Sequence, residues 1–277
     1  MNLQEYIKWS LIEDVGSGDY TTLSCIDADA YGRAVLKIKS DCIIAGIELA
    51  QMIAGEFDND LQFELVKHDG DVVKNGDVAF YISGKKRSLL TAERVILNCM
   101  QRMSGIATTT KQFVDAVSGT SARILDTRKT TPLNREIEKW AVRIGGGHNH
   151  RFGLFDMILI KDNHVDMCGG ITNAIKRAKA YIAENDLNLK IEIEVRNEAE
   201  IVEVCSTGGV DRILIDNFKP NDLESAVRMI KNQFETEASG GIVLDNVRDY
   251  ANTGVDFISV GALTHSFKSV DLSLKAL

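Results

Sequence analysis

The chain has 277 residues, of which 44% are hydrophobic and 26% charged, with 2 prolines and a formal net charge of −8. This composition is typical of a folded globular protein and excludes disordered and collagen-like chains, while the negative charge argues against nucleic acid or an anionic membrane as partner. No apolar run approaches the roughly 18 residues of a membrane span, and residues 1–10 lack the apolar stretch of a secretory signal, so we expect a cytoplasmic protein with no membrane partner. The five cysteines never form a C-x-x-C pair, which argues against a disulfide scaffold or a structural zinc site.

The first part of the chain, residues 1–115, has the pattern of an α+β domain. The spacing of apolar residues predicts helices over 3–13, 47–55 and 89–117, the last with a break at Ser104-Gly105. Strand-like stretches cover 34–39 and 61–67, and glycine-containing turns separate short alternating runs within 69–84. At about 100 to 200 residues per domain, the rest of the chain forms a second domain over 116–277.

After Gly119 the pattern changes to short apolar strands that alternate with amphipathic helices. The predicted strands are 123–126, 157–160, 191–195, 213–215, 236–238 and 257–260. The predicted helices are 134–143, 171–184, 198–205, 222–233 and 244–252. This alternation predicts a parallel sheet, and a barrel is favoured over a doubly wound sheet because no G-x-G-x-x-G follows the first strand. A complete eightfold barrel takes about 250 residues. We therefore expect an incomplete α/β barrel, with the last residues returning to the N-terminal domain.

The charges are unevenly distributed along the sequence. From Arg94 to Lys161 there are eleven Lys or Arg against five Asp or Glu, a local charge of +6, so the rest of the chain sums to −14. A cationic centre in an acidic chain predicts a small anionic ligand, because a nucleic-acid-binding protein is more often basic throughout.

Cationic residues follow two of the predicted strands, at the end where barrel enzymes carry their functional groups. Arg128 and Lys129 follow the first strand, and Lys161 follows the second. His150 and Arg151 come shortly after three consecutive glycines, which let the backbone approach a ligand closely. Arginine suits bidentate binding of a carboxylate and lysine suits a phosphate, so the ligand is predicted to carry both groups.

Acidic residues occupy the next two strands. Glu192 and Glu194 share one face of their strand by period two, and Asp216 ends the following strand. Glu194 and Asp216 have the chemistry to bind ribose hydroxyls, a divalent cation or a cationic transition state. For Glu192, pairing with an inward cation is as good an interpretation as a functional role.

Glycine-containing turns follow the last two predicted strands. They are Ser239-Gly240-Gly241 and Gly261. Adjacent late loops of this kind are typical of a barrel phosphate site, where backbone N–H groups bind an oxyanion. His265 lies one turn beyond Gly261 and either reaches the same anion or is a surface residue.

The residue types alone leave three other functions open. A pair of carboxylates would serve a glycosidase, although the surrounding cations favour an anionic substrate over a neutral sugar. Lys161 at a strand end would serve a Schiff-base lyase if its amine were neutral. A non-catalytic anion-binding protein would use the same cations and glycine turns.

Several long motifs resemble the quinolinate phosphoribosyltransferase family, in the family's order and over nearly the whole chain. The two most specific are ILDTRKTTP at 124–132 and GGGHNHRFGLFDMILIKDNH at 145–164. The others are EDVGSGDYTT at 13–22, AERVILNCMQRMSGIAT at 92–108, IEIEV at 191–195, ILIDN at 213–217, EASGGI at 237–242 and TGVDFISVGALTH at 253–265.

This resemblance implies an enzyme of NAD biosynthesis that converts quinolinate and phosphoribosyl pyrophosphate, with Mg²⁺, into nicotinate mononucleotide, pyrophosphate and CO₂. It also implies an N-terminal α/β sandwich domain followed by an open α/β barrel, and a homodimer or higher homo-oligomer whose active sites are shared between subunits. The closest alternative is a related protein associated with molybdenum transport. The set Arg94, Arg128 and Arg151 favours a dicarboxylate substrate and disfavours that alternative.

The resemblance also implies roles for individual residues. Those of the quinolinate pocket are Arg128, His150, Arg151 and Lys161, with Arg94 supplied to the partner subunit's site. Lys129 lies between the substrate carboxylate and phosphate, and Glu194 and Asp216 lie near the ribose and the metal, directly or through water and substrate. The phosphate-binding residues are Ser239, Gly240, Gly241 and Gly261, with His265 close by. The catalytic candidates are Lys129, Lys161, Glu194 and Asp216, and His148 receives no role.

Overall fold

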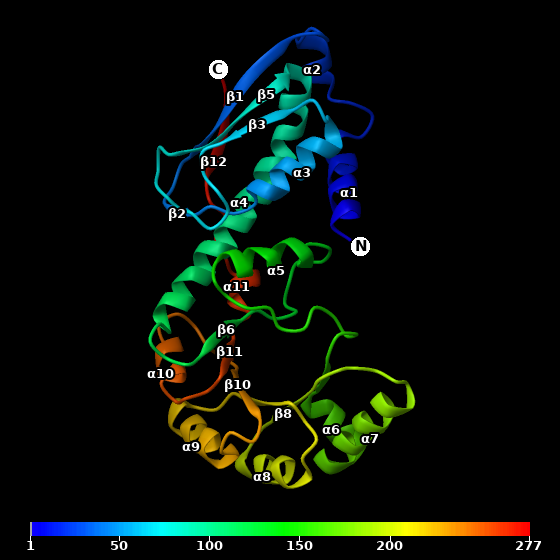
Figure 1. Ribbon diagram of the computed structural model, residues 1–277, viewed down its shortest axis with the longest axis vertical. Helices are drawn as coiled ribbons and strands as arrows, with labels where there is room; N and C mark the ends of the chain where they lie inside the picture. Colours follow the sequence, from blue (N-terminus) through cyan, green and yellow to red (C-terminus); the bar gives the residue numbers. More distant parts are fainter. Residues whose placement is uncertain (1) are drawn as a thin grey trace. The chain divides into compact units, whose positions relative to one another are not determined.

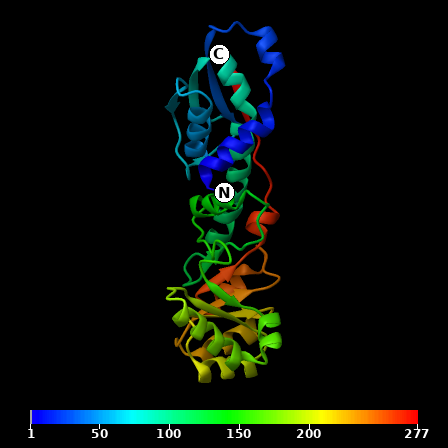
Figure 2. The ribbon, with the colours of Figure 1, turned by 90° about the vertical axis from the view of Figure 1, so that its right-hand side faces the viewer.

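The computed structural model describes residues 2–277, which divide into two compact units (Figures 1 and 2). The first unit contains the chain up to Lys111 together with Thr130–Gly146 and Leu263–Leu277. The second contains Gln112–Lys129 and Gly147–Ala262. None of the helices within residues 2–277 combines the length and apolar character that a membrane crossing requires.

The first unit contains a four-stranded antiparallel sheet in the order β12-β1-β5-β3. Its strands are β1 (Tyr31–Ile38), β3 (Gln62–Leu65), β5 (Val78–Lys85) and β12 (Leu272–Ala276). A two-stranded antiparallel pair is formed by β2 (Cys42–Ile43) and β4 (Val72–Val73). Because β12 pairs with β1, the last residues of the chain complete the sheet of the first unit.

The helices of the first unit begin with α1 (Leu3–Val15), whose first turn is closed by a capping box between Asn2 and Glu5. The others are α2 (Tyr20–Cys25), α3 (Ile47–Phe57), α5 (Arg135–Ile144) and α11 (Ala262–His265). Ile53 of α3 is fully buried, as are Met100 and Met103 of the long helix α4 (Lys86–Ala116). These apolar side chains form the core of the first unit.

Helix α4 (Lys86–Ala116) is continuous, so the predicted break at Ser104-Gly105 is wrong. The two small residues serve packing instead. The Ser104 hydroxyl accepts a hydrogen bond from the amide of Ala45 at 3.0 Å and donates one to its carbonyl at 3.1 Å. A Cβ atom at Gly105 would lie 2.4 Å from the carbonyl oxygen of Lys268. Glycine at this position therefore allows a second backbone segment to cross the helix closely.

The second unit is built on six parallel strands that alternate with helices along the chain. The strands are β6 (Arg123–Leu125), β7 (Ile158–Ile160), β8 (Ile191–Val195), β9 (Arg212–Asp216), β10 (Glu235–Ser239) and β11 (Phe257–Ser259). The helices are α6 (Asp162–Cys168), α7 (Ile171–Glu184), α8 (Glu198–Thr207), α9 (Pro220–Ile230) and α10 (Val247–Ala251).

The order of these strands is that of a barrel with one open seam. They are hydrogen-bonded as β6-β11-β10-β9-β8-β7, so each strand from β7 to β10 neighbours the next one in sequence, and β6 neighbours β11. Within the described part of the chain β6 and β7 are the two edges and do not pair with each other. The prediction of an incomplete α/β barrel is therefore confirmed.

Strand β8 shows how the barrel strands divide their side chains. All five residues are buried, with Ile191, Ile193 and Val195 on one face and Glu192 and Glu194 on the other. The apolar face suits packing against helices. The acidic face is matched by the neighbouring strands, because Glu192 lies opposite Arg212 of β9, which in turn lies opposite Glu235 of β10. The inner face of the barrel is thus lined with charged residues.

Candidate active site

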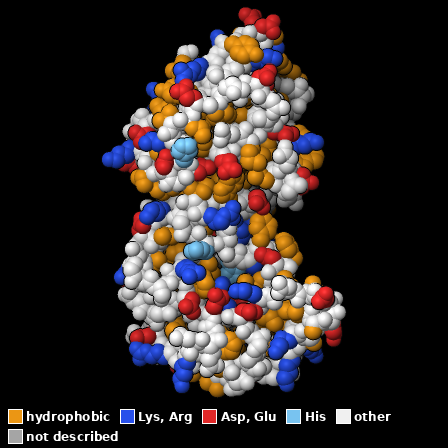
Figure 3. Space-filling view, in the orientation of Figure 1, with side chains coloured by type: hydrophobic (Ala, Val, Ile, Leu, Met, Phe, Trp, Pro, Cys, Tyr) orange, Lys and Arg blue, Asp and Glu red, His pale blue; other side chains and the backbone are white. Residues whose placement is uncertain are grey.

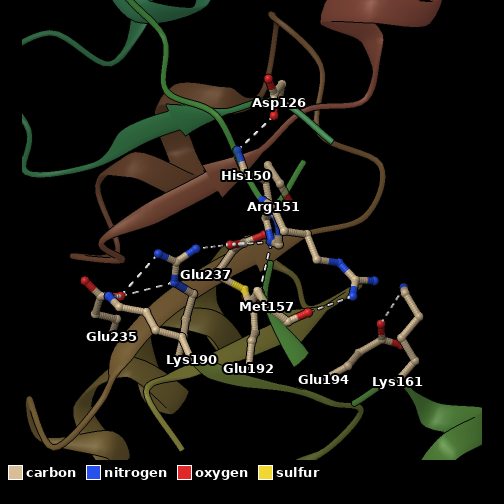
Figure 4. Close-up of polar contacts among 12 residues, drawn as sticks. Asp126, His150, Arg151, Met157, Lys161, Lys190, Glu192, Glu194, Glu235 and Glu237 are labelled. Carbon is tan, nitrogen blue, oxygen red and sulfur yellow. Dashed lines mark hydrogen bonds and ion pairs between the residues drawn. The ribbon is translucent and has the colours of Figure 1, made fainter. Parts of the chain in front are cut away.

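Arg128 and Arg151 form the cationic part of the site, and each is half-buried. Burial, followed by the charge of Arg128, lowers the pKa of the Arg151 guanidinium. Arg151 donates a hydrogen bond from Nη1 to the carbonyl of Met157 at 3.2 Å (Figure 4). The Nε atom of Arg128 is buried and has no hydrogen-bond acceptor among residues 2–277. Two mutually repelling arginines with unused donor capacity are suited to an anionic ligand.

Lys161 and Glu194 connect the cationic residues with the acidic ones. Lys161 follows β7, and its Nζ atom lies 3.0 Å from Oε2 of Glu194 on β8. The lysine side chain is 49% exposed, whereas the glutamate side chain is 8% exposed. The amine is engaged in an ion pair with a carboxylate, so this geometry disfavours the Schiff-base interpretation, in which the amine attacks a carbonyl group. On the face shown in Figure 3, side chains of Lys or Arg, of Asp or Glu and of His lie close together in the lower half of the view.

His150 is held at both its backbone and its ring (Figure 4). Its amide donates a hydrogen bond to Oδ1 of the fully buried Asp126 at 2.8 Å. Its Nε2 atom lies 2.9 Å from Oε2 of Glu192 and 3.4 Å from Oε2 of Glu237. Burial lowers the pKa of His150, but the two carboxylates raise it by more, to about 9. The amide of Arg151, 2.7 Å from Nδ1, opposes this charge because it requires a lone pair on that nitrogen.

The His150 ring contacts a network of buried charged side chains on the inner face of the barrel. Arg212 lies 2.9 Å from Glu237 through Nη1 and 3.2 Å from Glu235 through Nη2, and its guanidinium stacks 4.0 Å above the ring of Phe257. Burial and the nearby charge of Glu237 raise the pKa of Glu192 to about 7. Burial raises the pKa of Glu237 as well, but hydrogen bonding to His150 and the charges of His150 and Arg212 outweigh this and lower it. Glu192 thus pairs with an inward group, which was one of its two interpretations.

The same three side chains have a spacing that could suit a metal ion. One ligand atom from each of His150, Glu192 and Glu237 lies within 4.8 Å of the others. However, the guanidinium of Arg212 already neutralises Glu237 at 2.9 Å. A metal ion would have to sit beside that buried cation, so the arrangement is better suited to an ion-pair network than to a metal centre.

Asp216 and the Ser-Gly-Gly turn come together at the ends of β9 and β10. Asp216 accepts a hydrogen bond from the side chain of Asn217 at 2.5 Å, and the amide of Asn217 donates to the carbonyl of Ser239 at 2.8 Å. Gly240 has a φ of +96° and Gly241 a φ of +63°. A Cβ atom at Gly240 would lie 2.1 Å from Oδ1 of Asn217. The turn therefore requires glycine, as expected where successive backbone N–H groups form a concave anion site.

The remaining predicted site residues lie in several places. Lys129 is exposed, and its amide is fixed by a hydrogen bond to Oγ1 of Thr127 at 3.0 Å. Gly261 is half-buried, two residues after the end of β11. Arg94 and His265 belong to the first unit, whereas the other predicted residues belong to the second. Arg94 is exposed on α4, beside a surface cavity. His265 is exposed at the end of α11, with Nδ1 2.7 Å from the hydroxyl of Ser266.

Three residues that contribute to this arrangement were not predicted from the sequence. They are Asp126, Arg212 and Glu237. The sequence does carry a signal for Glu237, because Glu235, Glu237 and Ser239 alternate along one strand with the same period-two spacing as Glu192 and Glu194. Nothing in the local sequence distinguishes Asp126 from an exposed acid in a turn.

Comparisons with known proteins agree over both halves of the chain. The family of the N-terminal domain of quinolinate phosphoribosyl transferase matches residues 19–104, and that of its C-terminal domain matches residues 106–275. The chain is 45% identical to the chloroplastic nicotinate-nucleotide pyrophosphorylase [carboxylating] of Arabidopsis thaliana, over 99% of this chain and 82% of that protein. It is 40% identical to the probable nicotinate-nucleotide pyrophosphorylase [carboxylating] of Bacillus subtilis, over 99% and 93%.

The solved structures give the same result. The crystal structure of NadC from Streptococcus pyogenes superposes with a TM-score of 0.93 at 38% identity, over 99% of this chain and 96% of that one. The nicotinate-nucleotide pyrophosphorylase from Francisella tularensis gives a TM-score of 0.92 at 37% identity, over 99% and 96%. The chain therefore belongs to the quinolinate phosphoribosyltransferase family.

Proposed function

We propose that the chain transfers the phosphoribosyl group of phosphoribosyl pyrophosphate to quinolinate, with decarboxylation, as a step of NAD biosynthesis. The products are nicotinate mononucleotide, pyrophosphate and CO₂. The observation that carries this proposal is the buried Nε atom of Arg128, which has no acceptor among residues 2–277, together with the half-buried Arg151, whose pKa is lowered by burial and then by the charge of Arg128. Like charges held close together are stabilised by an anion with two carboxylates, and family membership supplies quinolinate as that anion.

Different residues bind the two substrates. In the proposal, Arg128, His150, Arg151 and Lys161 bind quinolinate. Lys129 lies between its carboxylate and the phosphates. The backbone N–H groups of Ser239, Gly240, Gly241 and Gly261 bind phosphate, as the glycine-dependent turn supports. Glu194 and Asp216 orient the ribose.

The reaction requires two changes in bonding. The ring nitrogen of quinolinate forms a bond to the anomeric carbon of the ribose, while the bond from that carbon to pyrophosphate breaks and the leaving group takes the electron pair. The alkylated ring is then a pyridinium, which accepts the electrons released when the 2-carboxylate leaves as CO₂ and a solvent proton takes its place. The chain contributes positioning and charge stabilisation: lysines share the charge of the departing pyrophosphate and Glu194 stabilises the developing positive charge on the ribose.

Mg²⁺ belongs to this proposal as the cofactor. Glu194 and Asp216 at the ends of adjacent strands offer carboxylate oxygens, which are the donors that Mg²⁺ prefers, and Mg²⁺ usually binds through one or two carboxylates together with substrate phosphates. When bound, the ion neutralises phosphate charge. The carboxylates would hold it directly or through water and substrate.

A homodimer with shared active sites, or a higher homo-oligomer built from it, completes the proposal. Arg94 lies exposed in the first unit and would complete the quinolinate pocket of the partner subunit. Inactive Arg94→Ala and Lys161→Ala variants should regain part of the activity when their subunits are mixed, because one of the two sites in a mixed dimer carries neither change. Mixed dimers that stay inactive would contradict the shared site. A cytoplasmic location stays a prediction.

The deciding experiment is the release of pyrophosphate and CO₂ from quinolinate and phosphoribosyl pyrophosphate in the presence of Mg²⁺. Nicotinate, which lacks the 2-carboxylate, is the matched control and should not be a substrate. Arg128→Ala should lose quinolinate turnover while keeping its circular dichroism spectrum. Pyrophosphate release without CO₂, or with nicotinate alone, would indicate a related enzyme with another ring substrate, and no release at all would indicate an anion-binding protein.

A further inference from the structure

We propose that Asp126 is a positioning residue for quinolinate binding, because it fixes together the two chain segments that carry Arg128 and Arg151. The inference rests on the proposed function, in which these two arginines bind the dicarboxylate. Asp126 would act through them and would not touch the substrate.

Asp126 is fully buried at the end of β6, and both of its carboxylate oxygens hold the same distant segment. Oδ1 accepts a hydrogen bond from the amide of His150 at 2.8 Å (Figure 4). Oδ2 accepts one from Nδ2 of Asn149 at 2.5 Å. The backbones reinforce this contact, since the amide of Asp126 donates to the carbonyl of His148 at 3.0 Å and the amide of His148 donates to the carbonyl of Ile124 at 2.8 Å. The segment 148–150 is thereby attached to β6, and the Asp126 side chain secures its end.

The position of Asp126 in the sequence links it to both arginines. Arg128 follows it by two residues, and Arg151 follows His150 by one. The Nε atom of Arg128 is buried without an acceptor among residues 2–277, and after burial the charge of Arg128 lowers the pKa of the Arg151 guanidinium, as repulsion between like charges does. In the absence of a bound anion this repulsion tends to separate the two segments. Hydrogen bonds from a buried carboxylate oppose the separation, because an acceptor with charge forms stronger bonds than a neutral one.

The ring of His150 is held from the opposite side. Its Nε2 atom lies 2.9 Å from Glu192 and 3.4 Å from Glu237, while its amide bonds to Asp126 (Figure 4). These carboxylates on β8 and β10 orient the ring. Asp126 alone among the three carboxylates is also part of the segment that leads to Arg128, so its loss affects both arginines at once.

The first test is Asp126→Asn, which keeps the size and removes the charge. If the amide oxygen faces His150, the amide nitrogen meets Nδ2 of Asn149 as a second donor unless Asn149 turns its own amide over, and in either case the charged acceptor is lost. We expect the KM for quinolinate to rise by about 10- to 100-fold, the effect of losing a buried hydrogen bond to a charged group, while the KM for phosphoribosyl pyrophosphate changes by less than about twofold.

The decisive control exchanges the two side chains in the double variant D126N/N149D. Nδ2 of the new asparagine then donates to the new carboxylate, so the bond is restored with its polarity reversed. We expect the KM for quinolinate to be at least about fivefold lower than in Asp126→Asn and to approach that of the wild type. Asn149→Asp alone places two carboxylates together and should be the most impaired member of the set, which closes a double-mutant cycle.

Three outcomes would overturn the inference: a normal KM for quinolinate in Asp126→Asn, equal increases in both KM values, or no recovery in the exchanged variant. If Asp126→Asn fails to fold, Asn149→Ala removes only the bond to Oδ2 and should still raise the KM for quinolinate selectively; an unchanged KM would count against the inference. Wild-type turnover is measured first. An inactive wild type overturns the proposed function, whereas an active wild type with an insensitive Asp126 overturns this inference alone.

Discussion

Replacing Arg212 by methionine tests whether the charges on the inner face of the barrel depend on one another. Arg212 is 8% exposed and pairs with the fully buried Glu237 at 2.9 Å. Methionine keeps the apolar contact with Phe257 and removes the cation. Glu237 is then left buried beside Glu192, with only His150 to offset two carboxylates.

The expected loss of stability follows from this uncompensated charge. Removing one partner of a buried ion pair costs about 3–5 kcal/mol, because the remaining charge stays out of water. At roughly 2–4 °C per kcal/mol for a domain of this size, the midpoint of thermal unfolding should fall by about 6–20 °C. Circular dichroism melting at one fixed protein concentration measures this shift.

A matched control and a rescue make the test specific. Arg228→Met breaks the exposed pair between Arg228 and Glu224 on α9, where the arginine side chain is 73% exposed, and should change the midpoint by less than about 2 °C. Adding Glu237→Gln to Arg212→Met removes the stranded charge and should recover part of the loss. A midpoint for Arg212→Met equal to that of the control would refute the argument that these buried charges are coupled.

Further predictions concern pH and two glycines. The pKa of His150 is about 9 in the folded protein, above the unfolded value of 6.5. The stabilisation of the fold by protonated His150 should therefore be complete below pH 6.5 and lost as the pH rises through 9. Denaturant midpoints of the wild type should fall across this range, and a flatter profile in His150→Gln would identify the group. Gly240→Ala places a Cβ atom 2.1 Å from Oδ1 of Asn217 at a φ of +96°, and should cost about 1–3 kcal/mol in denaturant melts and raise the KM for phosphoribosyl pyrophosphate. Gly105→Ala should lower the thermal midpoint although alanine favours a helix by about 1 kcal/mol, because its Cβ atom would lie 2.4 Å from the carbonyl of Lys268; a raised midpoint would contradict the close approach.

The elements that could be predicted from the sequence are those whose signals are local. Strand β8 and helix α7 were located to the residue, because alternating Ile and Glu mark the strand and a four-turn apolar stripe marks the helix. Helix α6, which follows Lys161 directly, was missed because it is short and mostly polar. Strand β12 was missed because it exists by pairing with β1, more than two hundred residues away.

The same distinction applies to the site. The cations after β6 and β7 could be predicted, since the carboxyl ends of parallel strands share one edge and the residues there are visible in sequence. The role of Ser104-Gly105 could not, because a small residue in a helix has the same local pattern whether the helix ends or another backbone crosses it. Asp126 was missed for a similar reason. Its burial depends on a segment more than twenty residues away.

Glu192, Arg212 and Glu237 form a charged layer inside the barrel. This layer is better explained by its orientation of the His150 ring than by a contribution to stability. Well-packed apolar side chains in place of a buried ion pair are often neutral or stabilising, so Glu192, Arg212 and Glu237 are not required to hold the strands together. Apolar residues could not orient the ring of His150, however, because its Nε2 atom needs a polar partner. His150 precedes Arg151 in the sequence, so the layer helps to position the cationic site by orienting the His150 ring, as Asp126 does by binding the His150 amide. On this reasoning Glu192→Gln should impair the affinity for quinolinate more than the stability of the fold, and a variant with lower stability but normal affinity would show that the layer serves packing alone.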